Sequence, residues 1–183
     1  MVLDAVRECV LAVGVRRTTL TDVAKRAGVS RMTLYRRYRD VDALIQDLLV
    51  REFGAMIRAA RDSARGGVHA RARLVATAAG IAGRVRRDEL VRRIVGVDRE
   101  LVLPYVLDRL GGPQRIAVAA FADAIAAGQG DGSIRPGDPQ QLAHVVLLLV
   151  QPFGISAGAV TGTLTEADLD RELKAVLDGY LRP

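Results

Sequence analysis

The sequence predicts an all-α fold, and three observations carry that prediction. Hydrophobic residues make up 50% of the 183 positions, which excludes a disordered chain and allows a sizeable core. Alanine, valine, leucine and arginine dominate, alternation of β-branched residues is scarce, and tryptophan is absent. Apolar residues instead recur at the spacing of helical faces. The length suits one or two domains.

The N-terminal segment predicts a first helix over residues 2–13. Leu3, Val6, Val10 and Val13 lie at helical spacing along it, so their side chains share one face. Gly14 then offers a C-terminal stop, because glycine readily adopts the left-handed conformation that ends many helices.

Two short helices follow, each with its own capping residue. Thr19 and Asp22 have the form of a capping box and open a helix over TDVAKRAG, which Gly28 ends. Ser30 is placed to cap the next helix, RMTLYRRY. Asp40 is placed to cap a longer helix that begins directly after it. The caps and stops therefore divide this region into three successive helices.

The turn AGVS joins the two short helices, and a tight turn containing glycine between such helices is the signature of a helix-turn-helix unit. In such a unit the second helix lies in the DNA major groove, with its N-terminal residues at the base edges. Leu34 and Tyr38 are expected to face the core, together with Val23, Ala24 and Ala27. The residues expected to point outward or toward the groove are Arg31, Met32, Thr33, Tyr35 and Arg37.

The charge distribution agrees with a polyanion-binding surface. Residues 16–39 hold eight arginines and lysines against Asp22 alone, whereas the whole chain has a formal net charge of +6. The window therefore contributes +7 and the rest of the chain −1. A basic run is usually only a solvated surface, but here the charge coincides with the helix-turn-helix pattern.

Residues 2–46 resemble the DNA-binding domain of the TetR family of transcriptional repressors, through the glycine, the threonines, AGVS and TLYRRY. Three departures stand out: Tyr38 replaces the usual phenylalanine, Val41 replaces a phosphate-contacting lysine, and the usual basic leader is missing. Arg39 is expected to take over part of that lysine's contact.

The resemblance also implies roles for the exposed residues. Arg31 and Met32 would lie closest to the bases, and Thr33, Tyr35 and Arg37 would contact phosphates. Thr19 and Thr21 would touch the backbone or groove edge from the preceding helix. Arginine suits a guanine base pair, whereas hydroxyl groups and further arginines fix the register on phosphate. For Tyr35, plain packing is the alternative.

Longer helices are expected beyond residue 46. They cover residues 41–63, 68–87 and 114–128, with short pieces over 88–110 between them. The run GQGDGSIRPGDP is expected to be a loop that ends with Asp138 as cap and Pro139 in the first turn. Thr165 and Asp168 are expected to cap a last helix that runs to about Leu181.

The stretch from Pro139 to Thr165 lacks charged residues and is long enough for a membrane-spanning helix. His144, Gln151 and Pro152 are poor lipid-facing residues, so a helix covered by protein is the preferred interpretation. By the resemblance, the last two helices would pack against their copies as a four-helix dimer interface.

Enzymatic, metal and secretory functions are not expected. The pattern GISAG at 154–158 matches a hydrolase nucleophile elbow, but both His69 and His144 precede Ser156, contrary to the order of that class. The two histidines have no neighbour at metal-ligand spacing, and no cofactor is expected. The lone Cys9 excludes an intramolecular disulfide and fits a cytoplasmic location.

Two features beyond the helix-turn-helix bear on ligands. Residues 71–93 form a second basic region, which is either a solvated helix face or a site for an anionic ligand or partner. Large or polar side chains among small apolar neighbours are candidates for the lining of an apolar effector pocket, although core packing is an alternative for each: Tyr105, Phe121 and Gln151.

The sequence therefore predicts two functional domains. Residues 1–46 would form the helix-turn-helix DNA-binding domain, and residues 47–183 a helical ligand-binding and dimerisation domain. The expected function is that of a homodimeric repressor, which a small-molecule effector releases from a palindromic double-stranded operator. The alternative is a helical interaction protein whose helix-turn-helix unit has lost sequence-specific regulation, with Val41 and the missing leader as its support.

Overall fold

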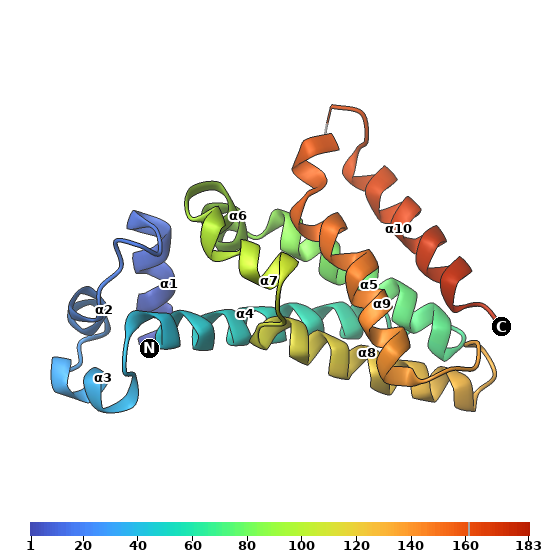
Figure 1. Ribbon diagram of the computed structural model, residues 1–183, viewed down its shortest axis with the longest axis horizontal. Helices are drawn as coiled ribbons and strands as arrows, with labels where there is room; N and C mark the ends of the chain where they lie inside the picture. Colours follow the sequence, from blue (N-terminus) through green and yellow to red (C-terminus); the bar gives the residue numbers. More distant parts are fainter. Residues whose placement is uncertain (161) are drawn as a thin grey trace. The chain divides into compact units, whose positions relative to one another are not determined.

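The computed structural model describes residues 1–160 and 162–183, and this part of the chain is helical without a strand (Figure 1). The predicted all-α fold is confirmed. The N-terminal helices are α1 (Val2–Val13), α2 (Leu20–Ala27), α3 (Arg31–Arg37) and α4 (Val41–Ser63). The later elements are α5 (Ala70–Arg87), α6 (Glu89–Val97), the 3₁₀ turn η1 (Arg99–Leu101), α7 (Leu103–Leu107), α8 (Gly112–Gly130), α9 (Pro139–Ile155), η2 (Ala157–Val160) and α10 (Glu166–Leu181).

The predicted caps lie at the helix starts. Thr19 accepts the backbone N–H of Asp22 at 3.1 Å, and Asp138 accepts that of Gln141 at 2.9 Å. At the start of α10, Thr165 accepts from the backbone of Asp168 at 3.1 Å while the Asp168 carboxylate accepts from that of Thr165 at 3.0 Å. Each cap satisfies an N–H that has no partner inside its helix.

Several helix boundaries differ from the prediction, and two of the differences have a clear physical cause. The helix expected from residue 68 begins at Ala70, because His69 Nδ1 accepts the N–H of Ala72 and Asp131 accepts that of Ala70. The expected loop GQGDGSIRPGDP begins as the end of α8. Gly128 remains helical there and packs so closely on Ile134 that an added Cβ would lie 2.4 Å from its Cδ1.

The chain divides by packing into two compact units. Unit 1 comprises residues 1–53 and 88–112, and unit 2 comprises residues 54–87 and 113–183. This division by packing differs from the functional division at residue 46. The functional domain boundary remains a prediction.

The core of unit 1 joins α1 to α4 with α6. Val6 and Val10 of α1 are fully covered and belong to the same cluster as Leu34 of α3. Leu90 and Ile94 of α6 complete it, although they follow α3 by more than fifty positions. The helix-turn-helix unit is therefore built on a core that a later helix finishes.

Unit 2 is organised around α5, which packs against α9 and α10 (Figure 1). The buried residues of α10 recur every four positions and form one stripe: Leu169, Leu173, Leu177 and Leu181. The side chain of Arg86 on α5 is only 5% exposed and forms ion pairs with Glu166 and Asp170. It also donates to the carbonyl of Phe153, so a single guanidinium joins the three helices.

The long apolar run contains α9 and is not a single helix. It ends as a helix at Ile155, and Ser156 separates it from η2. In the described residues no helix combines the length and apolar character needed to cross a bilayer. Thr161, which belongs to the run, lies outside the described residues. Leu148 of α9 is 67% exposed, so one face of the helix is uncovered in the single chain.

Candidate nucleic-acid interface

The turn between α2 and α3 follows from its glycine. Gly28 has φ +66° and ψ +30°, a left-handed conformation that ends α2, and Val29 donates to the carbonyl of Ala24 at 3.0 Å. Ser30 then accepts the N–H of Thr33 at 3.1 Å and starts α3. These bonds turn the chain sharply within the AGVS segment.

The inner face of α3 is fixed by packing. Leu34 is 1% exposed and Tyr38 5% exposed, as the sequence predicts. The pKa of Tyr38 is raised, because burial and a hydrogen bond with Asp47 both disfavour the phenolate. Tyr38 therefore holds the end of the recognition helix against α4.

The outer face of α3 carries the predicted contact residues. Met32 is 69% exposed and Tyr35 48% exposed, although large side chains of these types are more often buried. All the residues predicted to contact DNA are exposed: Thr19, Thr21, Arg31, Met32, Thr33, Tyr35, Arg37 and Arg39. The exposed arginines and apolar tips offer hydrogen bonds and methyl contacts, respectively, to a groove.

Besides Thr19, which caps α2, three of these residues make local contacts within the chain. The hydroxyl of Thr33 hydrogen-bonds that of Ser30 at 2.8 Å, and the Arg37 guanidinium lies over the ring of Tyr38, 5.4 Å from its centroid. Arg39 forms an ion pair with Asp40 at 2.8 Å. Asp40 therefore partly neutralises the charge of Arg39.

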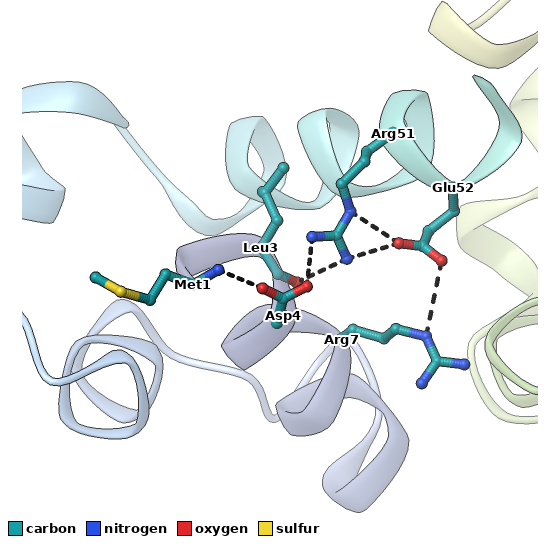
Figure 2. A network of polar contacts seen from close by, with 6 residues as sticks. All are labelled: Met1, Leu3, Asp4, Arg7, Arg51 and Glu52. Carbon is teal, nitrogen blue, oxygen red and sulfur yellow. Dashed lines mark hydrogen bonds and ion pairs between the residues drawn. The ribbon is translucent and has the colours of Figure 1, made fainter. Parts of the chain in front are cut away.

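A polar network fastens α1 to α4 (Figure 2). Arg51 of α4 donates to Asp4 at 2.7 Å and to Glu52 at 2.6 Å, and Glu52 also lies 3.7 Å from Arg7. Hydrogen bonds from the chain's terminal amino group and from Arg51 lower the pKa of Asp4. The network keeps α1, on which the helix-turn-helix packs, in a fixed position on α4.

Asp98 holds the turn that precedes α2, and the sequence did not predict this contact. It is 2% exposed at the end of α6, and its carboxylate accepts the N–H of Val15 at 2.8 Å. Gly14 has φ +85°, and a Cβ there would lie 3.0 Å from the same carboxylate. Arg16 pairs with Glu100 at 2.6 Å beside this bond. The turn that leads into α2 is therefore held by a residue more than eighty positions away, which no local pattern reveals.

Of the three predicted effector residues, Phe121 and Gln151 belong to unit 2 and Tyr105 to unit 1. Phe121 is 1% exposed and lines a pocket in unit 2. Tyr105 belongs to unit 1, where its hydroxyl accepts from Gln46 at 2.7 Å. Gln151 accepts from Gln114 at 3.3 Å and does not line the pocket.

Most arginines that are described here from the second basic region, residues 71–93, form ion pairs or hydrogen bonds within the chain. Arg71 lies 2.9 Å from Asp178, and Arg87 donates to Glu166 at 3.0 Å. Arg84 donates to the carbonyl of Ala59 at 3.2 Å. Arg73 of this region lines the pocket.

Comparison with known proteins agrees with this geometry. The family model for bacterial regulatory proteins of the tetR family matches residues 2–48. An uncharacterized HTH-type transcriptional regulator of Mycobacterium bovis is 36% identical over 98% of this chain and 92% of the relative. The chain belongs to the TetR family of transcriptional regulators.

The TetR-family fold extends over the whole chain. A TetR-family regulator from a Rhodococcus species, known from its crystal structure, has a TM-score of 0.71 and 28% identity, and the match covers 98% of this chain and 96% of that one. The FadR regulator of Bacillus subtilis, solved in complex with stearoyl-CoA, has a TM-score of 0.69 at 14% identity over 99% and 98% of the two chains. The latter similarity shows the fold alone.

Proposed function

We propose that this TetR-family regulator is a homodimeric repressor, which binds a palindromic operator and leaves it when a small-molecule effector binds. The observation that carries the proposal is that α3 has one buried face and one exposed face. Its inner residues, Leu34 and Tyr38, are buried, while Arg31 and Met32 at its N-terminal end are free to meet base edges.

Arg31 and Met32 would read bases in different ways. The guanidinium of Arg31 matches the two acceptors of guanine, and the exposed Met32 side chain suits apolar contact such as a thymine methyl group. Thr33, Tyr35 and Arg37 would fix the register on the phosphates. Thr19 and Thr21 would add contacts from the start of α2, and Arg39 a weaker one after α3.

The operator geometry and the exposed face of α9 both support a homodimer. Two half-sites about 34 Å apart require two recognition helices related by a two-fold axis. Leu148 of α9 and Val176 of α10 are 67% and 44% exposed, so each helix of the last pair offers apolar surface for a second copy. Burial of such surface is favourable, at roughly 25 cal/mol per Å².

Effector release requires different affinities of the effector for two states of the regulator. FadR of Bacillus subtilis, which shares the fold, binds stearoyl-CoA in its crystal structure. The pocket in unit 2 supports an effector site in this chain as well. Under this proposal, occupation of the pocket favours a half-site spacing that no longer fits the operator.

A gel-shift assay with the upstream region of the protein's own gene tests the proposal. We expect binding at modest salt that random DNA of equal length does not compete away. Equal competition by random DNA would contradict sequence-specific repression. Sedimentation at micromolar concentration should show a dimer of the 19.7 kDa chain, and a monomer alone would contradict the two-fold arrangement.

The competing function is an interaction protein with a degenerate helix-turn-helix. The ion pair of Arg39 with Asp40 favours it, because the residue expected to compensate for Val41 is already partnered. The same gel-shift assay separates the two functions. An interaction protein would retain only weak binding that disappears uniformly as salt rises.

A further inference from the structure

Unit 2 contains a pocket of about 620 Å³ between three helices. Its walls are the C-terminal part of α4, the N-terminal part of α5 and the C-terminal part of α8. The volume falls within the range of about 300–1,000 Å³ that is usual for small-molecule sites. The pocket is therefore large enough for an organic ligand of moderate size.

Part of the pocket lining is apolar. Phe121 of α8 and Leu74 of α5 are 1% and 2% exposed and form part of the wall. Along α8 the remaining lining residues include Ala120, Ala124 and Ala127, whose short side chains leave the space open. Such a wall suits a hydrocarbon chain, since burying apolar area is the dominant favourable contribution.

The lining also carries an excess of positive charge. Four arginines contribute to it against two aspartates, and all six side chains belong to exposed residues: Arg58, Arg61, Arg65, Arg73, Asp62 and Asp123. Arg65 already pairs with Asp62 at 2.6 Å. Arg73 donates to the carbonyl of Gly67 at 3.0 Å, which leaves its charge without a carboxylate.

Arg58 and Arg61 differ from Arg65 and Arg73, the other arginines of the lining, because in the described part of the chain they form neither a hydrogen bond nor an ion pair. Within residues 1–160 and 162–183, neither has a carboxylate within ion-pair distance. By contrast, Arg71 and Arg86 pair with aspartates of α10. Unpaired guanidinium groups beside an apolar pocket offer the donors that a carboxylate or a phosphate accepts.

We propose that this pocket binds an anionic amphiphile, with its carboxylate or phosphate group on Arg58 and Arg61 and its hydrocarbon chain against Phe121. This deepens the proposed function, because it names the chemical class of the effector. The apolar part of the lining alone would accept a neutral hydrocarbon. The arginines add a requirement for negative charge at one end.

Calorimetry on the full-length protein without DNA tests the site. The probes are dodecanoate, dodecyl phosphate and dodecanol, each below its micelle concentration, with acetate and inorganic phosphate as headgroups without a chain. We expect one or both charged amphiphiles to bind, and the tighter of them identifies the headgroup. Acetate, inorganic phosphate and dodecanol should each bind at least about tenfold more weakly. Acetate and phosphate lack the hydrocarbon chain, and dodecanol lacks the negative charge.

Three variants locate the binding. The double variant Arg58→Gln with Arg61→Gln should lower the affinity for the charged probe at least about tenfold and leave that for dodecanol unchanged. Ala124→Leu should weaken the binding of both the charged probe and dodecanol, because the larger side chain fills the space proposed for the hydrocarbon chain. Arg182→Gln changes an exposed arginine of the same unit that pairs with Asp178, and it should bind as the parent does.

The proposal is overturned if dodecanol binds as tightly as the charged probes, if the double arginine variant binds as the parent does, or if no amphiphile binds. These failures are distinct from failure of the proposed function. A protein that binds operator DNA but no amphiphile keeps its role as a regulator and loses only this ligand class. A protein that binds the amphiphile at the arginines, but stays on its operator, has the site without the release mechanism.

Discussion

Tyr35 and Tyr38 lie three positions apart, yet they have opposite environments. Tyr38 is 5% exposed with its hydroxyl group near Asp47, whereas Tyr35 is 48% exposed on the outer face of α3. The helical period alone separates them, because Tyr38 follows the buried Leu34 by one turn. At the scale of the residue, function therefore depends on which side of a short helix a side chain occupies.

The proposed base-reading role of Arg31 gives the first prediction. Arg31→Ala should cost roughly 1–3 kcal/mol of operator binding and relax the preference at one G·C position. Fluorescence anisotropy with a set of single-base operator variants measures both effects. A loss of equal size on every variant would mean that Arg31 contacts phosphate instead.

Arg36→Ala is the matched control, because Arg36 is exposed on the same helix but has no predicted base contact. It should leave the order of preference among the operator variants unchanged. Any small loss of affinity relative to the parent should become smaller as the salt concentration rises, as expected for a charge that interacts only with the general field of the DNA.

Asp98 gives the second prediction. Asp98→Ala removes the acceptor of the Val15 N–H inside a nearly closed site, so it should lower the free energy of unfolding by about 1–3 kcal/mol. Denaturant unfolding measures the change. Glu100→Ala, which removes only the more exposed pair with Arg16, should cost less than about 1 kcal/mol. Equal costs in the two variants would contradict a special role for the buried bond.

At the scale of the element, helix starts are fixed by side chains from near and far. Thr165 and Asp168 form a local capping box that the sequence shows directly. The start of α5 depends on Asp131, which lies sixty-one positions away and accepts the N–H of Ala70. The first kind of cap could be predicted, and the second could not.

These caps predict an acid-dependent loss of stability. Hydrogen bonds from Ser133 and the Ala70 N–H lower the pKa of Asp131 from 3.8 to about 2, and those from Thr165 lower that of Asp168 to about 2. In the folded state each carboxylate binds its proton less readily than in the unfolded chain. Its stabilisation is therefore present above pH 3.8 and is lost as the pH falls through about 2.

Thermal unfolding between neutral pH and pH 2 measures this dependence. Asp131→Asn and Asp168→Asn should each lower Tm at neutral pH and reduce its decline in acid. Asp123→Asn, which changes an exposed carboxylate in the interior of α8, should leave the profile unchanged. If the two cap variants follow the parent's profile, these carboxylates do not govern its acid sensitivity.

At the scale of the whole molecule, the proposed dimer uses the uncovered face of the last helices. Leu148→Asp places a charge on α9 where the parent exposes an apolar side chain. We expect the variant to sediment as a monomer and to lose operator binding, because one recognition helix reaches only one half-site. Analytical ultracentrifugation and the gel-shift assay measure the two effects.

Val68→Asp is the control for this experiment. Val68 is 88% exposed and precedes α5, outside the last pair of helices. It should dimerise and bind DNA as the parent does. A dimeric Leu148→Asp variant would place the interface on another surface of the chain.

Much of the recognition region could be predicted from the sequence, because its signals are local. Thr19 and Ser30 cap helices a few residues ahead of them, and Gly28 supplies the left-handed turn between. Leu34 and Tyr38 point inward because of helical periodicity. The exposure of the predicted contact residues follows from the same periodicity, since the opposite face of α3 is buried.

The sequence by itself determined the helices, their caps and the two faces of α3, since each depends on residues within about one or two helical turns. Only the tertiary structure decided that Asp98 holds the Val15 N–H, that α6 completes the core of unit 1, and that Arg58 and Arg61 share a pocket with Phe121. These relations join residues far apart in the chain. They arise from helix packing, which no local pattern specifies.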